Sequence, residues 1–386
     1  MYSIINCMEE IRIVEVKTKS QLRKFVDLPN VMYRDVPQFI PAFYGDDLQD
    51  WDRSKNPAFQ YCDARAFLAY RGDEIVGRIG AILSRRANEK WNTRRMRFTQ
   101  VDFIDDPLVS SRLFETVEEW ARQENCDELQ GPLGFCDLDR EGMLVEGFDR
   151  QSLFITYYNP PYYIEHLTRL GFVKDADWVE FRIAVPKEGD DSYNRISKVA
   201  DMVIKRGHYH KADLSRRSHF KPYIRKVFEL VNIAYADLYG TVELVKDQIE
   251  KYADKFVPLI NPDYCCIVLD EQEELAGFGV CCPSVDQALK KSRGRLFPFG
   301  WIGLLRSLRK NTVVDLLLIA VRPELQGKGI NAVILDHIMH SCIKNGIRYA
   351  ESGPQLELNH KINSQWKIFP IEQHKRRRCF VKKLSI

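Results

Sequence analysis

The segment from Val313 to Lys344 constrains the fold of this chain more than any other. An apolar run from Val313 to Val321 predicts a buried strand, and a periodic apolar pattern from Ile330 to Lys344 predicts a helix. The loop between them, Gln326-Gly-Lys-Gly329, ends in a glycine immediately before the helix. Backbone N–H groups at a helix start are free to bind anions, and the helix dipole adds positive potential there. The segment therefore predicts a binding site for a diphosphate.

Two common phosphate-binding loops do not fit this spacing. A nucleotide P-loop ends in Gly-Lys-Ser/Thr after four spacer residues, but here Gly329 and Ile330 follow the lysine. A Rossmann loop requires three glycines over six positions, and only two are present. An ordinary strand–helix turn, whose glycines serve geometry alone, is the alternative that the loop itself leaves open.

The chain also repeats itself. In both halves the predicted order is a strand hairpin around a charged turn, a strand ending near a proline, a helix, and a short strand ending in Gly-Pro. This shared order predicts two copies of one α/β unit. The matching segments are 65–81 with 265–281, 98–123 with 316–344, and 128–132 with 349–354.

The two copies differ at the start of the shared helix. The first copy has Asp105-Asp106-Pro107 where the second has the glycine loop, and two carboxylates there would repel a diphosphate. We therefore expect the second copy to bind the phosphate ligand and the first to close the acceptor side of the site. A polar run near residue 187 marks the boundary. The predicted domains are residues 1–186, a connector with the first strand of the second unit over 187–219, and residues 220–386.

Composition narrows the functional class. The 386 residues are 45% hydrophobic and 29% charged, which is ordinary for a globular protein of two domains. A net charge of +3 gives no electrostatic basis for binding nucleic acid. The ten cysteines show no C-x-x-C pair or metal-ligand spacing, so no metal site is expected. Residues 1–8 do not resemble a secretion signal, and no apolar stretch reaches about 18 residues, so we expect a cytoplasmic protein without a transmembrane segment.

The sequence from Val321 to Asn331 resembles the acyl-CoA loop of the GNAT N-acyltransferase superfamily. The usual pattern is Gln/Arg-x-x-Gly-x-Gly/Ala, which Gln326 and Gly329 match and Asn331 does not. Other segments, between about Ile11 and Leu384, are similar to a group of long, two-copy bacterial GNAT proteins. These segments are 55–59, 131–149, 157–163, 171–172 and 357–363.

The resemblance implies an α/β fold of two tandem GNAT-like units, each with a mixed central sheet flanked by helices. It also implies that the first copy lacks the CoA loop and that the second binds acetyl-CoA or another acyl-CoA. The strand before the loop would hold the pantetheine arm, although ordinary sheet pairing is the alternative for its backbone groups. The residues implied are Ile319, Ala320, Val321, Gln326, Gly327, Lys328, Gly329, Ile330 and Asn331.

One expected part of a GNAT active site is absent. Many members carry a tyrosine, on the helix after the Gly-Pro strand, that protonates the leaving thiolate. That position falls on Phe369 or Pro370, and neither side chain can donate a proton. Another residue or solvent would have to serve, and a non-catalytic acyl-CoA-binding or sensing protein becomes an alternative.

Acyl transfer to an amine also requires a general base. Glu351, in the strand that faces the opened sheet, is the first choice. Asp315 is the second, with a buried structural carboxylate as its alternative. Asn359 and Asn363 lie four residues apart on one helix face, where they would bond the pantetheine amides or cap the helix start.

An acceptor site is predicted in the first copy. The segment 157–163 is rich in aromatic hydroxyls, with Tyr158 or Asn159 expected to touch the substrate. Glu146 lies in an acidic loop that suits a cationic amine. The alternatives are a proline-anchored turn whose tyrosines cover a core, and solvated loop charges.

Two further segments have several interpretations. Residues 296–310 are apolar with a basic end, which fits a membrane surface, a channel for an apolar substrate or a core-packed connector. The basic run His374 to Arg378, with Lys382 and Lys383, fits the 3′-phosphate of CoA, an anionic lipid or a solvated strand face.

We expect an acyl-CoA-dependent N-acyltransferase, in the first place an N-acetyltransferase, that works by direct attack of a small-molecule amine in a ternary complex. Long-chain acyl transfer to a lipid-like amine is the alternative within enzymes, because segment 296–305 is apolar. The protein is expected as a monomer or a homodimer.

Overall fold

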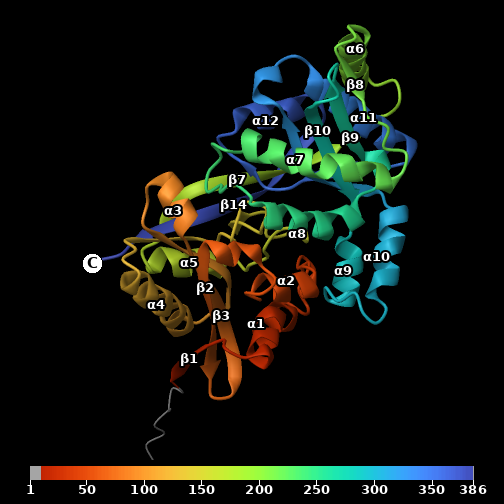
Figure 1. Cartoon of the computed structure of the whole chain (residues 1–386). Helices are drawn as coiled ribbons and strands as arrows, with labels where there is room; N and C mark the ends of the chain where they lie inside the picture. Colours follow the sequence, from red (N-terminus) through yellow and green to blue (C-terminus); the bar gives the residue numbers. More distant parts are fainter. Residues whose placement is uncertain (1–9, 386) are drawn as a thin grey trace, which may run out of the picture. The chain divides into compact units, whose positions relative to one another are not determined.

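The computed structural model describes residues 10–385, except for the side chains of Arg217, His360, Lys361 and Ser364. Residues 1–8, predicted to lack a secretion signal, lie outside the described residues. The chain divides into two compact units (Figure 1). The first unit holds the described residues up to 152, residues 157–177 and those from 377 onward, and the second unit holds 153–156 and 178–376.

Both units consist of strands and helices of ordinary length. The elements of the first unit are β1 (Ile11–Glu15), α1 (Lys19–Met32), α2 (Tyr44–Asp50), β2 (Cys62–Arg71), β3 (Glu74–Ser84), α3 (Arg85–Trp91), β4 (Arg95–Phe103), α4 (Pro107–Gln123), β5 (Glu128–Gly131), β6 (Met143–Glu146) and α5 (Tyr162–Arg169). Those of the second unit are α6 (Asp191–Lys205), β8 (Tyr209–Lys211), α7 (Lys221–Ala234), α8 (Lys246–Phe256), β9 (Cys265–Asp270), β10 (Leu275–Pro283), α9 (Asp286–Ser292), α10 (Gly300–Arg309), β11 (Val313–Val321), α11 (Ile330–Lys344), β12 (Tyr349–Ser352), β13 (Gln355–Leu356) and α12 (His360–Gln365).

Two long strands, β7 (Val173–Ala184) and β14 (Ile371–Lys383), are each divided between the units. The predicted ranges 1–186, 187–219 and 220–386 therefore differ from the observed units, since residues from 377 onward belong to the first. The segment 187–219, expected as a connector and a strand, contains the helix α6 as well as β8.

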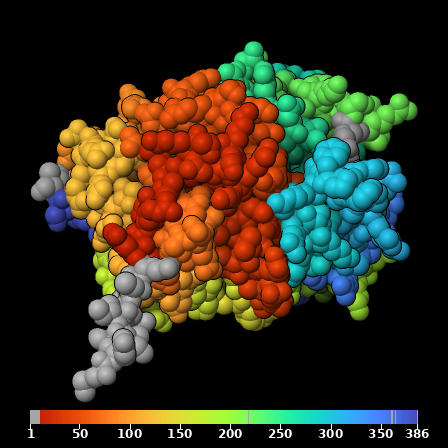
Figure 2. Space-filling view, turned by 90° about the horizontal axis from the view of Figure 1, so that it is seen from below, coloured from red at the N-terminus to blue at the C-terminus, as the bar shows by residue number. Residues whose placement is uncertain are grey.

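The second unit is a sheet in the order β7-β12-β11-β10-β9-β8 with helices on both faces. Apolar residues of α6 and α11 pack on one face, and those of α7 on the other, as Figure 1 shows. β11 and β12 are parallel, and the other neighbours are antiparallel. The insertion between β10 and β11, which contains α9 and α10, reaches the molecular surface (cyan in Figure 2).

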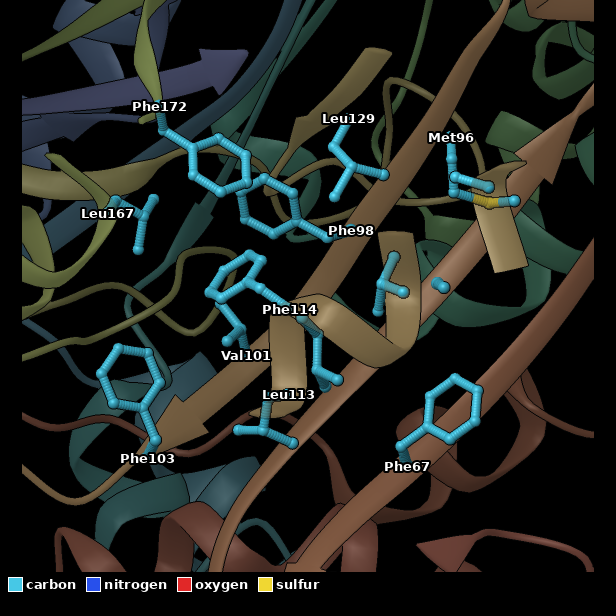
Figure 3. Packing of buried hydrophobic residues seen from close by; sticks show 14 of the residues in the cluster. Phe67, Met96, Phe98, Val101, Phe103, Leu113, Phe114, Leu129, Leu167 and Phe172 are labelled. Atoms are coloured by element: carbon cyan, nitrogen blue, oxygen red, sulfur yellow. The ribbon is translucent and has the colours of Figure 1, made fainter. Parts of the chain in front are cut away.

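The first unit repeats this plan with the order β1-β2-β3-β4-β5-β14, in which only β4 and β5 are parallel. Its core is aromatic, with Phe98 edge-on to Phe114 and to Phe172 at centroid distances of 5.2 and 5.5 Å (Figure 3). α4 begins at Pro107. The Asp106 side chain accepts the Leu108 N–H, and proline suits a first helical position.

Three global features bear on function. No helix among residues 10–385 combines the length and the apolar character that crossing a bilayer requires. The nine cysteines within this range are buried, and none of them forms a disulfide there. In the same range no group of His, Cys, Asp or Glu is arranged to hold a metal ion.

Candidate active site

The strand, loop and helix around Gly327 and Gly329 have the predicted boundaries. β11 ends at Val321, and α11 begins at Ile330. Gly327 and Gly329 have φ of 79° and 87°, in the left-handed region that favours glycine. The side chains of Gln326, Lys328 and Asn331 are exposed.

Four backbone amides at this helix start are open. Within residues 10–385, the N–H groups of Gly327, Gly329, Ile330 and Asn331 donate to no protein acceptor, whereas the Lys328 N–H donates to the Leu325 carbonyl at 3.3 Å. Unpaired N–H groups at a helix start, together with the helix dipole, form a ready anion site. The geometry therefore suits a diphosphate.

The two glycines have different surroundings, which gives a stability prediction. A Cβ on Gly329 would lie 2.7 Å from Val203 Cγ2 of α6, whereas a Cβ on Gly327 would meet nothing within 4 Å. We expect Gly327→Ala to destabilise the protein by about 1 to 2 kcal/mol, the cost of a left-handed alanine. Gly329→Ala should cost about 1 kcal/mol more, because it adds the steric clash. Urea unfolding measures both, and equal costs would contradict the packing of α6 on this loop.

The sheet opens beside the same strand. β11 pairs with β12 from Val313 to Leu316, whereas its pairing with β10 continues to Val321. Beyond Ser352 the chain leaves β11 and pairs with β7 through β13. The half of β11 nearest the loop therefore has one edge without a strand partner in the described structure. Such an edge offers backbone groups to an extended ligand.

One carbonyl in this half of β11 has a side-chain partner. The Tyr235 hydroxyl, at the end of α7, donates to the Ile319 carbonyl at 3.0 Å. Ala320 and Val321 are buried, on the faces covered by α7 and by α11 respectively. The side chain of Tyr235 thus reaches the strand that is predicted to hold the pantetheine arm, a contact that the sequence does not indicate.

A row of charged side chains crosses the sheet just before it opens. The strand register places Arg182 of β7 beside Glu351 of β12, and Glu351 beside Asp315 of β11. Arg182 donates to Glu351 at 2.8 Å. Glu351 is nearly buried, with a relative exposure of 5%, and lies one residue before the end of β12. The predicted base therefore lies where the two parallel strands separate.

Glu351 also contacts His374 of β14. The distance from His374 Nε2 to Glu351 Oε2 is 2.8 Å, and both side chains are buried. Burial raises the pKa of Glu351, but the hydrogen bond and charge of His374, aided by Lys375 and Arg182, outweigh burial and lower it below its ordinary value. A carboxylate with a lowered pKa is a weak base, but it orients a histidine well. The sequence did not indicate this role for His374, because the residue begins a run of basic residues.

Asp315 has a different environment. It is fully buried and makes no ion pair within the described residues. Burial and the neighbouring Asp286 carboxylate raise the pKa of Asp315 well above its ordinary value. A fully buried carboxyl group that holds its proton more tightly than usual is a poor general base, so the structure favours the alternative of a buried structural carboxyl group.

The raised pKa of Asp315 gives a pH-dependent prediction. The folded state binds this proton more tightly than the unfolded state, so the stabilisation is complete below the unfolded pKa of 3.8 and is lost as pH rises through the folded pKa. Asp315→Asn removes this titration. We expect it to raise the free energy of unfolding by about 1 to 3 kcal/mol at pH 8 and to have little effect at pH 4. Urea unfolding at the two pH values tests this, and a pH-independent effect would contradict the raised pKa of Asp315.

The predicted helix asparagines have local partners. The Asn359 side chain accepts the Ile362 N–H at 3.4 Å, and Asn363 donates to the carbonyls of Leu356 and Glu357 at 3.0 and 3.1 Å. These contacts favour the capping alternative for Asn359, whereas Asn363 binds the chain that precedes the helix. Phe369 is buried in the core of the second unit, so no proton donor stands at that position.

The equivalent edge of the first unit is occupied by its own side chains. β4 pairs with β5 only over Arg95 to Arg97. Further along, the Tyr163 hydroxyl contacts the Phe103 N–H at 2.7 Å, and the Tyr162 hydroxyl donates to the Phe103 carbonyl at 2.6 Å. The first copy therefore lacks the open strand edge as well as the glycine loop. At its helix start, Asp105 contacts His166, and Asp106 pairs with Arg71.

The predicted acceptor residues lie in this first unit and have mixed surroundings. The Asn159 side chain is buried and bonds both the N–H and the carbonyl of Leu144, at 2.7 and 3.0 Å. The Tyr158 ring packs edge-on against Tyr33 at 5.0 Å. Glu146 is exposed. The contacts of Tyr158 and Asn159 favour the structural alternative, a turn whose aromatic residues cover a core.

Most residues of the basic run of β14 have partners within the protein, which disfavours the alternative of a solvated strand face for those residues. Lys375 and Glu180 form a fully buried ion pair at 2.8 Å. Charged or polar partners also neutralise other members. Arg376 pairs with Glu357, Arg377 donates to the Tyr157 carbonyl, Arg378 pairs with Asp177, and Lys382 pairs with Glu118. The start of the run is therefore largely buried, whereas Lys383 at its end is exposed.

Comparisons with known proteins agree with this geometry. Residues 227–361, which contain the open loop and the opened sheet, match the family model described as the acetyltransferase (GNAT) family. A solved tandem GNAT protein from the clavulanic acid biosynthesis pathway has the same fold, with a TM-score of 0.57, 13% identity, and coverage of 98% of this chain and 99% of that one. Residues 227–361 therefore resemble the acetyltransferase (GNAT) family, and the chain has the fold of a tandem GNAT protein.

Two curated relatives share sequence over most of their length. The chain is 26% identical to Protein YghO of Escherichia coli K12, over 95% of this chain and 94% of that protein. It is also 26% identical to a protein named bacterial ceramide synthase, of Caulobacter vibrioides, over 78% of this chain and 77% of that protein.

Proposed function

We propose that this protein is an N-acyltransferase that moves an acyl group from acyl-CoA to the amine of a long-chain, lipid-like acceptor. The observation that carries the proposal is the set of four open amides at the start of α11, beside the unpaired edge of β11. Acyl-CoA is the acyl donor. The open amides suit its diphosphate, and the unpaired strand edge suits its extended pantetheine arm.

The reaction combines bond formation, bond cleavage and proton transfer. The amine nitrogen bonds to the thioester carbonyl carbon, the C–S bond breaks, and the amine gives up a proton while the CoA thiolate leaves and is protonated. We assign acceptance of the amine proton to His374, held by Glu351, because both lie at the point where β11 and β12 separate. Asp315 is not part of this assignment. The thiolate takes its proton from solvent or from a residue other than Phe369 or Pro370.

A long-chain acceptor is favoured by the relative named ceramide synthase, since a ceramide is an N-acylated long-chain amino alcohol. The exposed apolar segment 297–305 supports the same choice. N-acetylation of a small polar amine is the second candidate, favoured by the match to an acetyltransferase family model.

Thiol release from acyl-CoA tests the proposal. The donors are acetyl-CoA and palmitoyl-CoA, and the acceptors are a sphingoid base and ethanolamine, which share an amino alcohol head but differ in chain length. We expect release of CoA with the sphingoid base and palmitoyl-CoA, with the amide confirmed by mass spectrometry. Activity with ethanolamine and acetyl-CoA alone would support the second candidate. Tight binding of CoA by calorimetry, without transfer to any amine in a broad panel, would indicate a sensing protein.

A further inference from the structure

The insertion between β10 and β11 exposes a compact apolar surface. Over residues 297–305, two phenylalanines, a tryptophan, an isoleucine and a leucine face solvent. Their relative exposures are 80% for Phe297, 74% for Phe299, 44% for Trp301, 52% for Ile302 and 43% for Leu305. We name these five residues the apolar patch. Figure 2 shows the insertion that contains them as part of the molecular surface.

The patch is held in place by the rest of the insertion. α10 buries Leu308, and a Cβ on Gly303 would lie 3.7 Å from the Ala288 Cβ of α9. The Trp301 indole N–H donates to the Pro298 carbonyl at 3.0 Å. One face of the insertion is therefore packed, while the face with the large side chains is left open.

The charged residues next to the patch in sequence are all basic. Residues 287–314 contain seven lysines and arginines and no aspartate or glutamate. Lys291, Arg306, Arg309 and Lys310 are exposed and make no ion pair with any residue of the described chain. Exposed aromatic and aliphatic side chains beside exposed lysines and arginines are the composition of an interfacial membrane anchor. An acidic protein partner would explain the basic residues but not the density of large apolar side chains.

We propose that the apolar patch and the basic residues beside it bind the surface of a bilayer that contains anionic lipids. The apolar side chains enter the boundary between headgroups and acyl chains, and the lysines and arginines contact lipid phosphates. The bilayer is contacted without being crossed, in agreement with the absence of a membrane-spanning helix from the described residues.

The apolar patch and the candidate active site are connected through the same strand, β11. The insertion lies between the end of β10 and the start of β11, whereas the glycine loop follows the other end of β11, about 30 Å away along a nine-residue strand. Asp315 and its neighbour Glu351 lie at the end nearer the insertion. A lipid amine in the bilayer would thus approach the end of the strand opposite to the diphosphate.

Vesicle binding tests this surface without any acyl transfer. The wild type is sedimented with vesicles of phosphatidylcholine, alone or mixed with phosphatidylglycerol, and we expect binding to the mixed vesicles. The variant Phe297→Ser/Phe299→Ser/Trp301→Ser should bind them about tenfold or more weakly. The control Met202→Ser/Ile233→Ser removes two other exposed apolar side chains of the second unit, with relative exposures of 50% and 61%, and should bind like the wild type.

Charge and fluorescence measurements complete the test. Arg306→Glu/Arg309→Glu should abolish the preference for phosphatidylglycerol, and added salt should weaken wild-type binding. Subtracting the emission spectrum of Trp301→Phe from that of the wild type isolates the fluorescence of Trp301. We expect this fluorescence to shift to shorter wavelength when vesicles are added. Urea unfolding of each variant verifies its fold.

Equal binding of wild type and patch variant, or no binding to either vesicle, overturns the proposal. A dimer in light scattering that the patch variant dissociates, without vesicle binding, would make the patch an interface between two copies of the chain.

Discussion

Replacing Glu351 by glutamine should lower kcat for acyl transfer by about 100- to 10,000-fold, the range expected for loss of acid–base catalysis. The glutamine keeps the size of the side chain but no longer offers a carboxylate to His374 Nε2, which lies 2.8 Å away. The imidazole then loses the group that orients it. Because neither side chain is predicted to touch the diphosphate, KM for acyl-CoA should change little.

Substitution of His374, together with the pH dependence of kcat, distinguishes the two members of the pair. If His374 accepts the proton, kcat depends on its imidazole, and His374→Gln should abolish transfer. If Glu351 itself accepts it, its lowered pKa keeps it ionised, and activity should persist into more acidic conditions. His374→Gln should match Glu351→Gln in the first case only. Glu180→Gln is a control that disturbs another buried ion pair of the same unit, and full activity of both Glu351→Gln and His374→Gln would exclude the pair.

The second large effect is expected at the start of α11. Asn331→Asp places a negative charge beside the four open amides. It should weaken acyl-CoA binding by about 10- to 100-fold, equivalent to about 1.4 to 2.8 kcal/mol. The same charge interacts favourably with the helix dipole, so the free energy of unfolding should stay constant or rise by about 0.3 to 1 kcal/mol. Lower affinity with undiminished stability is a combination that damage to the fold does not produce.

Lys344→Gln provides the matched control. It changes the net charge by the same amount at the exposed far end of the same helix. We expect it to bind acyl-CoA like the wild type. Isothermal titration with CoA and with acetyl-CoA measures both variants. If Asn331→Asp bound CoA as tightly as Lys344→Gln, the diphosphate would have to bind elsewhere.

Much of the second unit is predictable because its signals are local. The apolar run 313–321 and the periodic pattern 330–344 match the bounds of β11 and α11, with the glycine loop between them. Hairpins, strands and Gly-Pro ends of the repeat also lie where the pattern places them. Each of these features depends on neighbouring residues, so a single sequence is enough to indicate it.

The interior of the candidate site was hidden because its contacts join distant residues. Lys375 finds its partner in Glu180, and His374 finds Glu351, through pairing of strands that are far apart in the chain. A run of basic residues looks the same in sequence whether solvent or buried carboxylates neutralise it. The contacts of Tyr162 and Tyr163 with Phe103 are hidden for the same reason. A pair of tyrosines in the sequence does not indicate which strand their hydroxyl groups contact.

The division of β14 bears on how the protein is made. The first unit includes residues from 377 onward, and β5 pairs with Phe380 through Lys383 of that strand. During translation the ribosome delivers the rest of this unit about two hundred residues before its final strand. The nascent first unit must therefore wait with an unfilled sheet edge, which makes it a candidate client for chaperones. A chain truncated before residue 377 should be unable to complete the sheet of the first unit and should therefore fail to reach the native fold.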